Sequence, residues 1–243
     1  MNKKQILFLS SFIITTVLFT GCINASTEKA SVQSPNQNMK VAFHLTQSGR
    51  PAYTVEYKEQ LIIDTSYLGF TFLEDDQFTS HLEITDWHLN NYDSSWTMPW
   101  GEKKEVRNHY NELTVHLEEQ KENPRKVDIS FRIYNDGVGF RYTFPEQPHF
   151  SEALIMEEHS EFNLTGDHTC WWIPGDWDIY EHLYNTTKFS EINAISKRAN
   201  DELAQSHIPL NAVNTPVTMR TDNGLHISFH EADLTDYAGM TLK

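Results

Sequence analysis

The sequence is poor in cysteine, and this limits how its fold can be stabilised. The 243 residues include two cysteines, Cys22 and Cys170. If Cys22 carries a lipid, as argued below, Cys170 is the single thiol of the mature chain and no disulfide can form within it. Stability must then come from a packed core, for which the 12% aromatic content supplies bulky side chains. Cys170 has apolar neighbours, so we expect a small buried residue and not a nucleophile.

Positive charge is also scarce. Nineteen Lys and Arg residues stand against 34 Asp and Glu residues, which gives a formal net charge of −15. A nucleic-acid-binding surface needs clustered Lys and Arg, so we predict no nucleic-acid partner. An acidic surface suits neutral ligands, cations or solubility.

Several catalytic signatures are missing. The chain has no H-E-x-x-H, no C-x-x-C, no G-x-S-x-G and no glycine-rich phosphate loop. It also lacks an internal repeat, and no apolar run after the first twenty residues is long enough to cross a membrane. No sequence signature therefore names a reaction.

The amino terminus predicts export. Two lysines precede the apolar run Ile6–Phe19, which is too short for a comfortable membrane span and predicts a signal peptide over residues 1–21. The end of this run resembles a bacterial lipobox, although Phe19 replaces the usual Leu, and favours lipidation of Cys22 over simple secretion. Residues 22–38 are polar and predict a flexible tether. We expect a lipoprotein in the periplasm or at the outer membrane or cell surface.

Period-two alternation dominates residues 39–243 and predicts an all-β domain. Apolar residues alternate in KVAFHLT (40–46) and KVDISFRIY (126–134), as in half-buried antiparallel strands. Asn135-Asp136-Gly137 follows the second run and predicts a hairpin with VGFRYTF (138–144). Further short runs predict about ten strands and a sandwich or barrel, at 52–57, 69–73, 81–88, 113–118, 153–159, 215–221 and 225–230. Phe189–Gln205 is the single predicted helix.

Ser94–Leu113 is the first candidate for a functional site. Its tryptophans, Trp96 and Trp100, either cover a sandwich edge or stack on sugar rings. Arg107 either pairs with a carboxylate or, together with neighbouring polar side chains, hydrogen-bonds sugar hydroxyls; these neighbours are Asn108, His109 and Asn111. Buried aromatic residues usually serve packing, so the residues alone favour the structural alternative.

WWIPGDWDIYEHLYN (171–185) is the second candidate. Pro174-Gly175 predicts a turn out of a strand near Cys170–Ile173 into a loop that carries Trp177. Asp176, Asp178 and Glu181 offer oxygen ligands for Ca²⁺, which needs six to eight of them. The EF-hand spacing is absent, so other ligands must come from elsewhere.

His230 and Glu231 form the third candidate. They end a predicted strand and are either a polar pair at the mouth of a site or ordinary strand-end residues. Adjacent residues of a strand point to opposite faces, which weakens a joint role.

Several stretches together resemble the amino-terminal domain of glycoside hydrolase family 97 from about Ser34 to Lys243. They include WGEKKEVRNHYNEL (100–113), FRIYNDGVGFRYTFPEQ (131–147) and TCWWIPGDWDIYEHLYNTTKFSEI (169–192). The resemblance implies an exported bacterial α-glucosidase or α-galactosidase with three parts: an antiparallel β-supersandwich like galactose mutarotase, a catalytic (β/α)₈ barrel and a small carboxy-terminal β-domain. It also implies that Lys243 precedes the barrel and the last strands of the sandwich.

The resemblance also implies a role for Glu181. In similar enzymes a glutamate in the loop after the W-I-P-G-D motif completes a Ca²⁺ site beside the catalytic glutamates, and the matching position is Glu181. The catalytic residues would lie in the absent barrel, because glycoside hydrolysis needs two carboxylates at a set separation and no such pair is identifiable here.

The sequence therefore leaves three hypotheses. The first is the pocket-forming domain of a Ca²⁺-dependent α-glycosidase that acts on α-linked oligosaccharides together with a barrel domain. In it, substrate contacts would come from loop residues: Trp100, Arg107, Asn108, His109, Trp177, His230 and Glu231. The second is a stand-alone, non-catalytic glycan-binding lipoprotein that uses its tryptophans as stacking platforms. The third is a remnant without function.

Overall fold

The computed structural model describes residues 30–197 and 206–243. The predicted signal peptide and Cys22 lie outside the described residues, as do residues 198–205 of the predicted helix. Within the described ranges, no helix has the length and apolar character that a membrane crossing requires.

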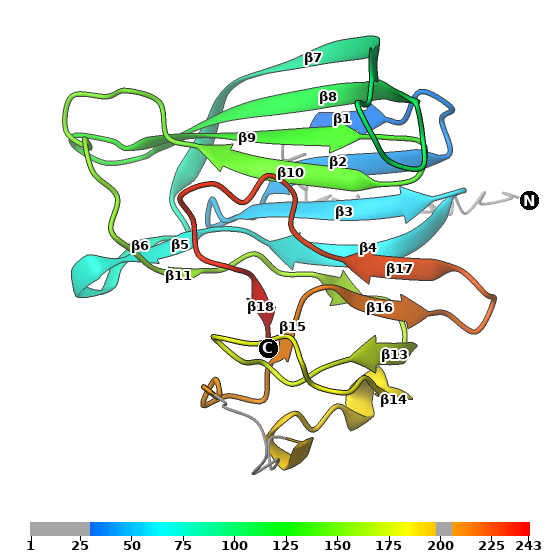
Figure 1. The fold of residues 1–243 in the computed structure, drawn as a ribbon. Helices are drawn as coiled ribbons and strands as arrows, with labels where there is room; N and C mark the ends of the chain where they lie inside the picture. The colour runs from blue at the N-terminus through cyan, green and yellow to red at the C-terminus, as the bar shows by residue number, and fades with distance from the viewer. Residues whose placement is uncertain (1–29, 198–205) are drawn as a thin grey trace, which may run out of the picture.

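Two antiparallel sheets form the body of a sandwich (Figure 1). The first has the strand order β1-β2-β3-β4-β12 and contains β1 (Ala30–Gln33), β2 (Met39–Leu45), β3 (Pro51–Tyr57), β4 (Gln60–Tyr67) and β12 (Asn163–Leu164). The second has the order β10-β9-β8-β7 and contains β7 (Leu82–Thr97), β8 (Glu105–Glu119), β9 (Lys126–Ile133) and β10 (Val138–Thr143). The predicted all-β antiparallel fold is confirmed.

The alternating residues face inward and join the two sheets. Phe43 of β2 and Phe131 of β9 are fully buried, and their ring centroids lie 6.1 Å apart. Tyr53 of β3 lies 5.7 Å from Phe131 and 5.7 Å from Phe140. The predicted hairpin is confirmed, because β9 and β10 pair from Val138 opposite Ile133 onward. The core thus lies where the period-two pattern places it.

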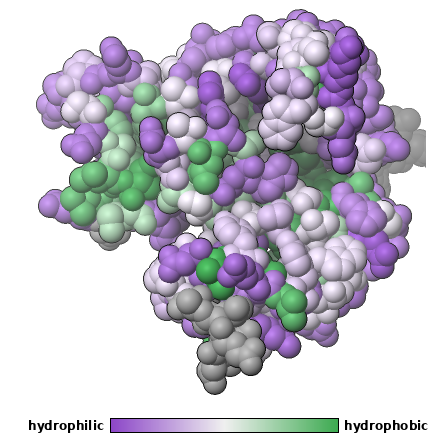
Figure 2. Space-filling view, viewed as in Figure 1, coloured by the Kyte–Doolittle hydropathy of each residue, from purple (hydrophilic) through white to green (hydrophobic). Residues whose placement is uncertain are grey.

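A smaller sheet extends this core at one corner. It contains β11 (Ile155–Glu158), β5 (Phe70–Phe72) and β6 (Asp76–Phe78), in that order, and the 3-10 turn η1 (Leu73–Asp75) links β5 to β6. The rings of Phe72 and Phe78 pack there beside the guanidinium of Arg125, which lies 5.1 Å from each ring centroid. Figure 2 shows an apolar patch over this corner, where Leu154 and Met156 are exposed.

A further sheet carries the tryptophan-rich stretch. Its order is β14-β13-β16-β17, with β14 (Asn185–Lys188), β13 (Thr169–Trp172), β16 (Val217–Arg220) and β17 (His226–Phe229). A two-stranded sheet pairs β15 (Val213–Asn214) with β18 (Thr241–Leu242). Phe229 packs on Phe162 with ring centroids 4.7 Å apart, which joins this sheet to the sandwich core.

The predicted tether is too long at its carboxy-terminal end. Residues 30–33 form β1, which pairs antiparallel with β2, and Ala30 and Val32 are buried. The alternation of Ala30 and Val32 with polar residues is too short to stand out from the polar composition around it. Residues 22–29 lie outside the described range.

The predicted helix is wrong in its described part. Residues 189–197 contain two 3-10 turns, η2 (Phe189–Glu191) and η3 (Ile195–Lys197), neither of which has a buried residue. Phe189 and Ile195, two members of the apolar stripe that predicted the helix, are exposed. An apolar stripe without a surface to cover gives a helix little stabilisation.

Candidate functional site

Candidate residues from the first stretch lie on a long hairpin. Strands predicted at 81–88 and 113–118 extend to residues 97 and 105 as β7 and β8, so Arg107, Asn108 and His109 are strand residues. Trp100 lies in the connecting turn and is 82% exposed, whereas Trp96 is about half exposed.

Arg107 makes an ion pair across this hairpin. Its Nε donates to Asp93 Oδ1 at 2.7 Å, and its Nη2 donates to Oδ2 at 2.6 Å. These hydrogen bonds hold the pKa of Asp93 below its usual value. Nε and Nη2 of Arg107 are therefore bound to a carboxylate, which is the structural alternative given for Arg107 in the sequence analysis. Asp93 itself was missed, because no local pattern indicates which strand pairs with which.

The second stretch begins in β13, where its residues are partly or fully buried, and then leaves the strand. Trp172 is fully buried and its Nε1 donates to Thr187 Oγ1 at 3.0 Å, so this ring is core. Trp171 instead lies partly exposed on the opposite face, where it stacks on His226 with a ring-centroid distance of 6.2 Å. Of these two neighbouring rings Trp172 alone belongs to the core, because adjacent strand residues face opposite sides.

Cys170 is fully buried beside Trp172. Burial raises the pKa of its thiol to about 11. Because a thiol of such high pKa carries little thiolate at neutral pH, the structure agrees with the expected structural role.

Asp176 organises the loop that follows. Its Oδ1 accepts hydrogen bonds from the backbone N–H groups of Asp178 at 2.9 Å and Ile179 at 3.2 Å. Its Oδ2 accepts from Ser206 N at 3.2 Å and lies 3.4 Å from His182 Nε2. Burial alone would raise the pKa of Asp176, but these hydrogen bonds outweigh it and hold the pKa below the usual value.

Asp176 is therefore a structural residue and not the metal ligand that its position suggested. Its side chain is fully buried and its oxygens are engaged within the loop. Glu181 is exposed in the same loop. Among residues 30–197 and 206–243, no group of three or more His, Cys, Asp or Glu side chains is arranged to hold a metal ion. Since Ca²⁺ takes six to eight oxygens, the Glu181 carboxylate by itself does not make a Ca²⁺ site.

The same loop presents a row of exposed apolar side chains. Trp177 is 69% exposed and Leu183 is 90% exposed, and Tyr180 and Tyr184 are more than half exposed. We call the surface of residues 177–184 the loop face. Exposed apolar groups gathered on an anchored loop are typical of an interaction surface.

His230 and Glu231 do not form a joint site. His230 Nδ1 lies 3.0 Å from the backbone oxygen of Glu231, and the Glu231 carboxylate accepts a hydrogen bond from Met240 N. Glu231 thus fixes the carboxy-terminal segment. The β7–β8 hairpin lies at the top of Figure 1 and the β13–β14 region at the bottom, so the predicted substrate-binding residues do not form one cluster within the described chain.

Comparisons with known proteins agree on one family. The family model for the glycosyl-hydrolase 97 N-terminal domain matches residues 32–243. A family 97 glycoside hydrolase from Pseudoalteromonas sp. strain K8, solved in complex with panose, is 33% identical with a TM-score of 0.76 over 87% of this chain. The same enzyme solved with acarbose gives a TM-score of 0.74.

Two further matches are less similar in sequence. A retaining alpha-galactosidase from Bacteroides thetaiotaomicron (strain VPI-5482) is 22% identical over 96% of this chain. A beta-arabinopyranosidase structure is 22% identical with a TM-score of 0.61. The chain spans about a third of the length of these relatives, 33% of the galactosidase and 30% of the Pseudoalteromonas enzyme. The chain therefore belongs to glycoside hydrolase family 97, of which it represents the N-terminal domain.

Proposed function

We propose that this chain is the pocket-forming domain of an exported, Ca²⁺-dependent α-glycosidase that acts on α-linked oligosaccharides. The observation that carries the proposal is the match to the N-terminal domain of family 97 over residues 32–243, in relatives about three times as long. The catalytic carboxylates would come from a barrel domain that packs against this one.

The loop face supports this arrangement. Asp176 fixes the loop from inside, while Trp177, Leu183 and their neighbours remain exposed. Burying such side chains against another domain is favourable by roughly 25 cal/mol per Å² of apolar surface. Glu181, on the same loop, would then reach the sugar site as one oxygen ligand of Ca²⁺, which orients the reacting groups when bound.

Sequencing the messenger RNA through and beyond codon 243 tests the proposal. A barrel coding sequence that continues in frame, or after a frameshift, is the expected result. Unrelated sequence there would contradict the proposal. The protein that the message encodes should hydrolyse α-glucosides or α-galactosides, and the assay with both substrates decides between them.

A variant pair tests the role of Glu181 in that protein. Glu181→Gln should lower the affinity for Ca²⁺ and the activity together, because one charged ligand is lost. Glu102→Gln, in the exposed hairpin turn of the same acidic chain, should change neither. Equal Ca²⁺ affinity in the Glu181→Gln variant and the parent would remove Glu181 from the site.

Exposed tryptophans favour a second candidate, a non-catalytic glycan-binding lipoprotein. Trp100 and Trp177 have the exposure that stacking on sugar rings requires. Titrating the purified chain with maltooligosaccharides and galactosides while following tryptophan fluorescence tests this function. A fluorescence change that is lost in Trp100→Ala or Trp177→Ala supports the glycan-binding function. No fluorescence change with any of the sugars would contradict it.

A further inference from the structure

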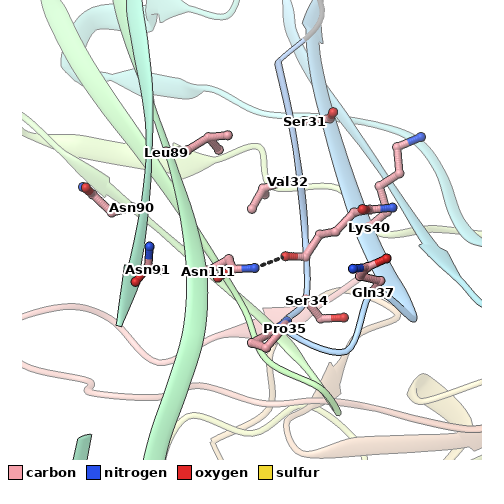
Figure 3. Close-up of a pocket in the computed structure, with 11 residues that line it drawn as sticks. Ser31, Val32, Ser34, Pro35, Gln37, Lys40, Leu89, Asn90, Asn91 and Asn111 are labelled. Atoms are coloured by element: carbon pink, nitrogen blue, oxygen red, sulfur yellow. Dashed lines mark hydrogen bonds between the residues drawn. The ribbon is translucent and has the colours of Figure 1, made fainter. Parts of the chain in front are cut away.

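A polar cleft lies where the two main sheets end. β1 is the edge strand of one sheet and β7 is the edge strand of the other. A cavity of about 620 Å³ lies between them, lined by β1, the β1–β2 turn, β7 and β8 (Figure 3). It is remote from the loop face, which lies beyond the opposite side of the sandwich in Figure 1.

The lining of this cleft differs in charge from the rest of the chain. The sequence contains 34 Asp and Glu residues, yet among residues 30–197 and 206–243 no carboxylate lines the cleft. Lys40, the one charged side chain that these residues contribute, lies 3.7 Å from Glu56 in an ion pair that neutralises it. The cleft therefore suits a neutral ligand.

Amide side chains supply most of the polar lining. Asn91 enters from β7 and Asn111 from β8, while Gln37 comes from the facing turn; Asn90, next to Asn91 on β7, points to the opposite face (Figure 3). Each amide offers both donors and an acceptor, which is the pattern needed for vicinal hydroxyl groups.

A hydrogen bond joins the two walls of the cleft, which also has an apolar portion. Asn111 Nδ2 donates to the backbone oxygen of Gln33 at 2.7 Å and ties β8 to β1 (Figure 3). Leu89, which is 52% exposed, and Pro35 add apolar surface to the lining. The volume of the cleft, about 620 Å³, lies within the roughly 300–1,000 Å³ of small-molecule sites, and its lining is more polar than is usual for them, as a ligand rich in hydroxyl groups requires.

We propose that this cleft binds a neutral saccharide at a site separate from the loop face. The amide of Asn91 hydrogen-bonds sugar hydroxyls, and the C–H face of the sugar packs on Leu89, which lies on the same face of β7 as Asn91. This site is not part of the proposed function. The proposed function enters only in the choice of α-linked sugars as test ligands.

Calorimetric titration of the full chain with maltotriose and melibiose tests the site. Binding of at least one sugar is expected, with little dependence on salt because no charge pairing is involved. Asn91→Ala should weaken it about fivefold, the change that loss of one neutral hydrogen bond produces. Asn91 is exposed and outside the anchoring contact, so this variant should fold, as circular dichroism would verify.

Matched controls distinguish this site from the loop face. Trp177→Ala and Glu181→Gln should bind the sugars as the parent does. The proposal is overturned if neither sugar binds, if only a charged sugar such as glucose 6-phosphate binds, or if Trp177→Ala abolishes binding that Asn91→Ala leaves intact. Because the assay uses this chain alone, its outcome does not depend on whether a barrel sequence follows codon 243.

Discussion

Glu119 and Arg125 form a two-point ion pair inside the sandwich. Arg125 Nε and Nη2 each donate to a Glu119 carboxylate oxygen at 2.7 Å, and both side chains are less than 8% exposed. Burial opposes ionisation of Glu119, but the hydrogen bonds from Arg125 outweigh it and hold the pKa of that carboxyl below its usual value. Arg125 also donates to Asp76, so a single guanidinium connects β6 to the β8–β9 connection.

Removing one partner of this pair should destabilise the fold strongly. Arg125→Met removes both guanidinium hydrogen bonds from the buried Glu119 carboxylate and leaves it the partly exposed Lys121, at 3.0 Å, as its cationic partner; such a change costs about 3 kcal/mol. Urea unfolding followed by circular dichroism measures the loss. The double variant Arg125→Met, Glu119→Leu should recover much of it, and Arg107→Met, in the exposed pair with Asp93, should change the unfolding free energy little.

Acid should loosen the loop face before it unfolds the sheets. The folded-state pKa of Asp176 is lowered, so its contribution to stability is complete above the ordinary pKa of an aspartate and is lost as the pH falls through the folded-state value. Proteolysis between residues 177 and 184 should therefore rise at acidic pH. Asp176→Asn should show that cleavage already at neutral pH; an uncut variant would contradict the role given to Asp176.

Cys170 should be unreactive in the native protein. Because burial raises its pKa to about 11, an alkylating reagent at mildly alkaline pH finds little thiolate and no access. Mass spectrometry should detect alkylation of Cys170 in urea and not under native conditions. Alkylation at equal rates in the two conditions would show that β13 opens readily.

The isolated chain should self-associate through the loop face. Trp177 and Leu183 are exposed at 69% and 90%, and exposed apolar surface promotes association. The double variant Trp177→Ser, Leu183→Ser should be monomeric over a wider concentration range in sedimentation velocity. Its unfolding free energy should stay near that of the parent, because neither side chain belongs to the core. Substitution of Leu154 and Met156, in the other apolar patch, serves as a matched control.

Period-two alternation predicted the inner faces of β2, β9 and β10 correctly, since a half-buried strand must alternate. The same rule did not predict the full length of β7, which continues well past its first residues. From Thr85 onward nearly every residue of β7 is exposed, so no apolar alternation marks the strand. The length of β7 is set by its pairing with β8, and the local sequence of β7 does not reveal that pairing.

The sequence predicted which residues the candidate loop contains, but not which of their side chains are buried and which are exposed. The loop after Pro174-Gly175 lies where the turn signal placed it, and its acidic residues divide into buried Asp176 and exposed Glu181. The local sequence does not separate these two carboxylates, because two of the residues that hold Asp176 in place, Asn214 and Ser206, come from much later in the chain. The amide-lined cleft was also missed, since it joins β1 and β7, which no sequence pattern brings together.

The length of β7 has a consequence for solvent exchange. In the part of the chain that the structure describes, β7 has β8 as its one neighbouring strand, so alternate backbone N–H groups point away from the sheet. Amide protons along Leu82–Thr97 should therefore exchange with deuterium in a fast–slow pattern with a period of two residues. Glu83 and Asp86 place negative charges along this strand, which disfavours pairing of its open edge with that of another molecule.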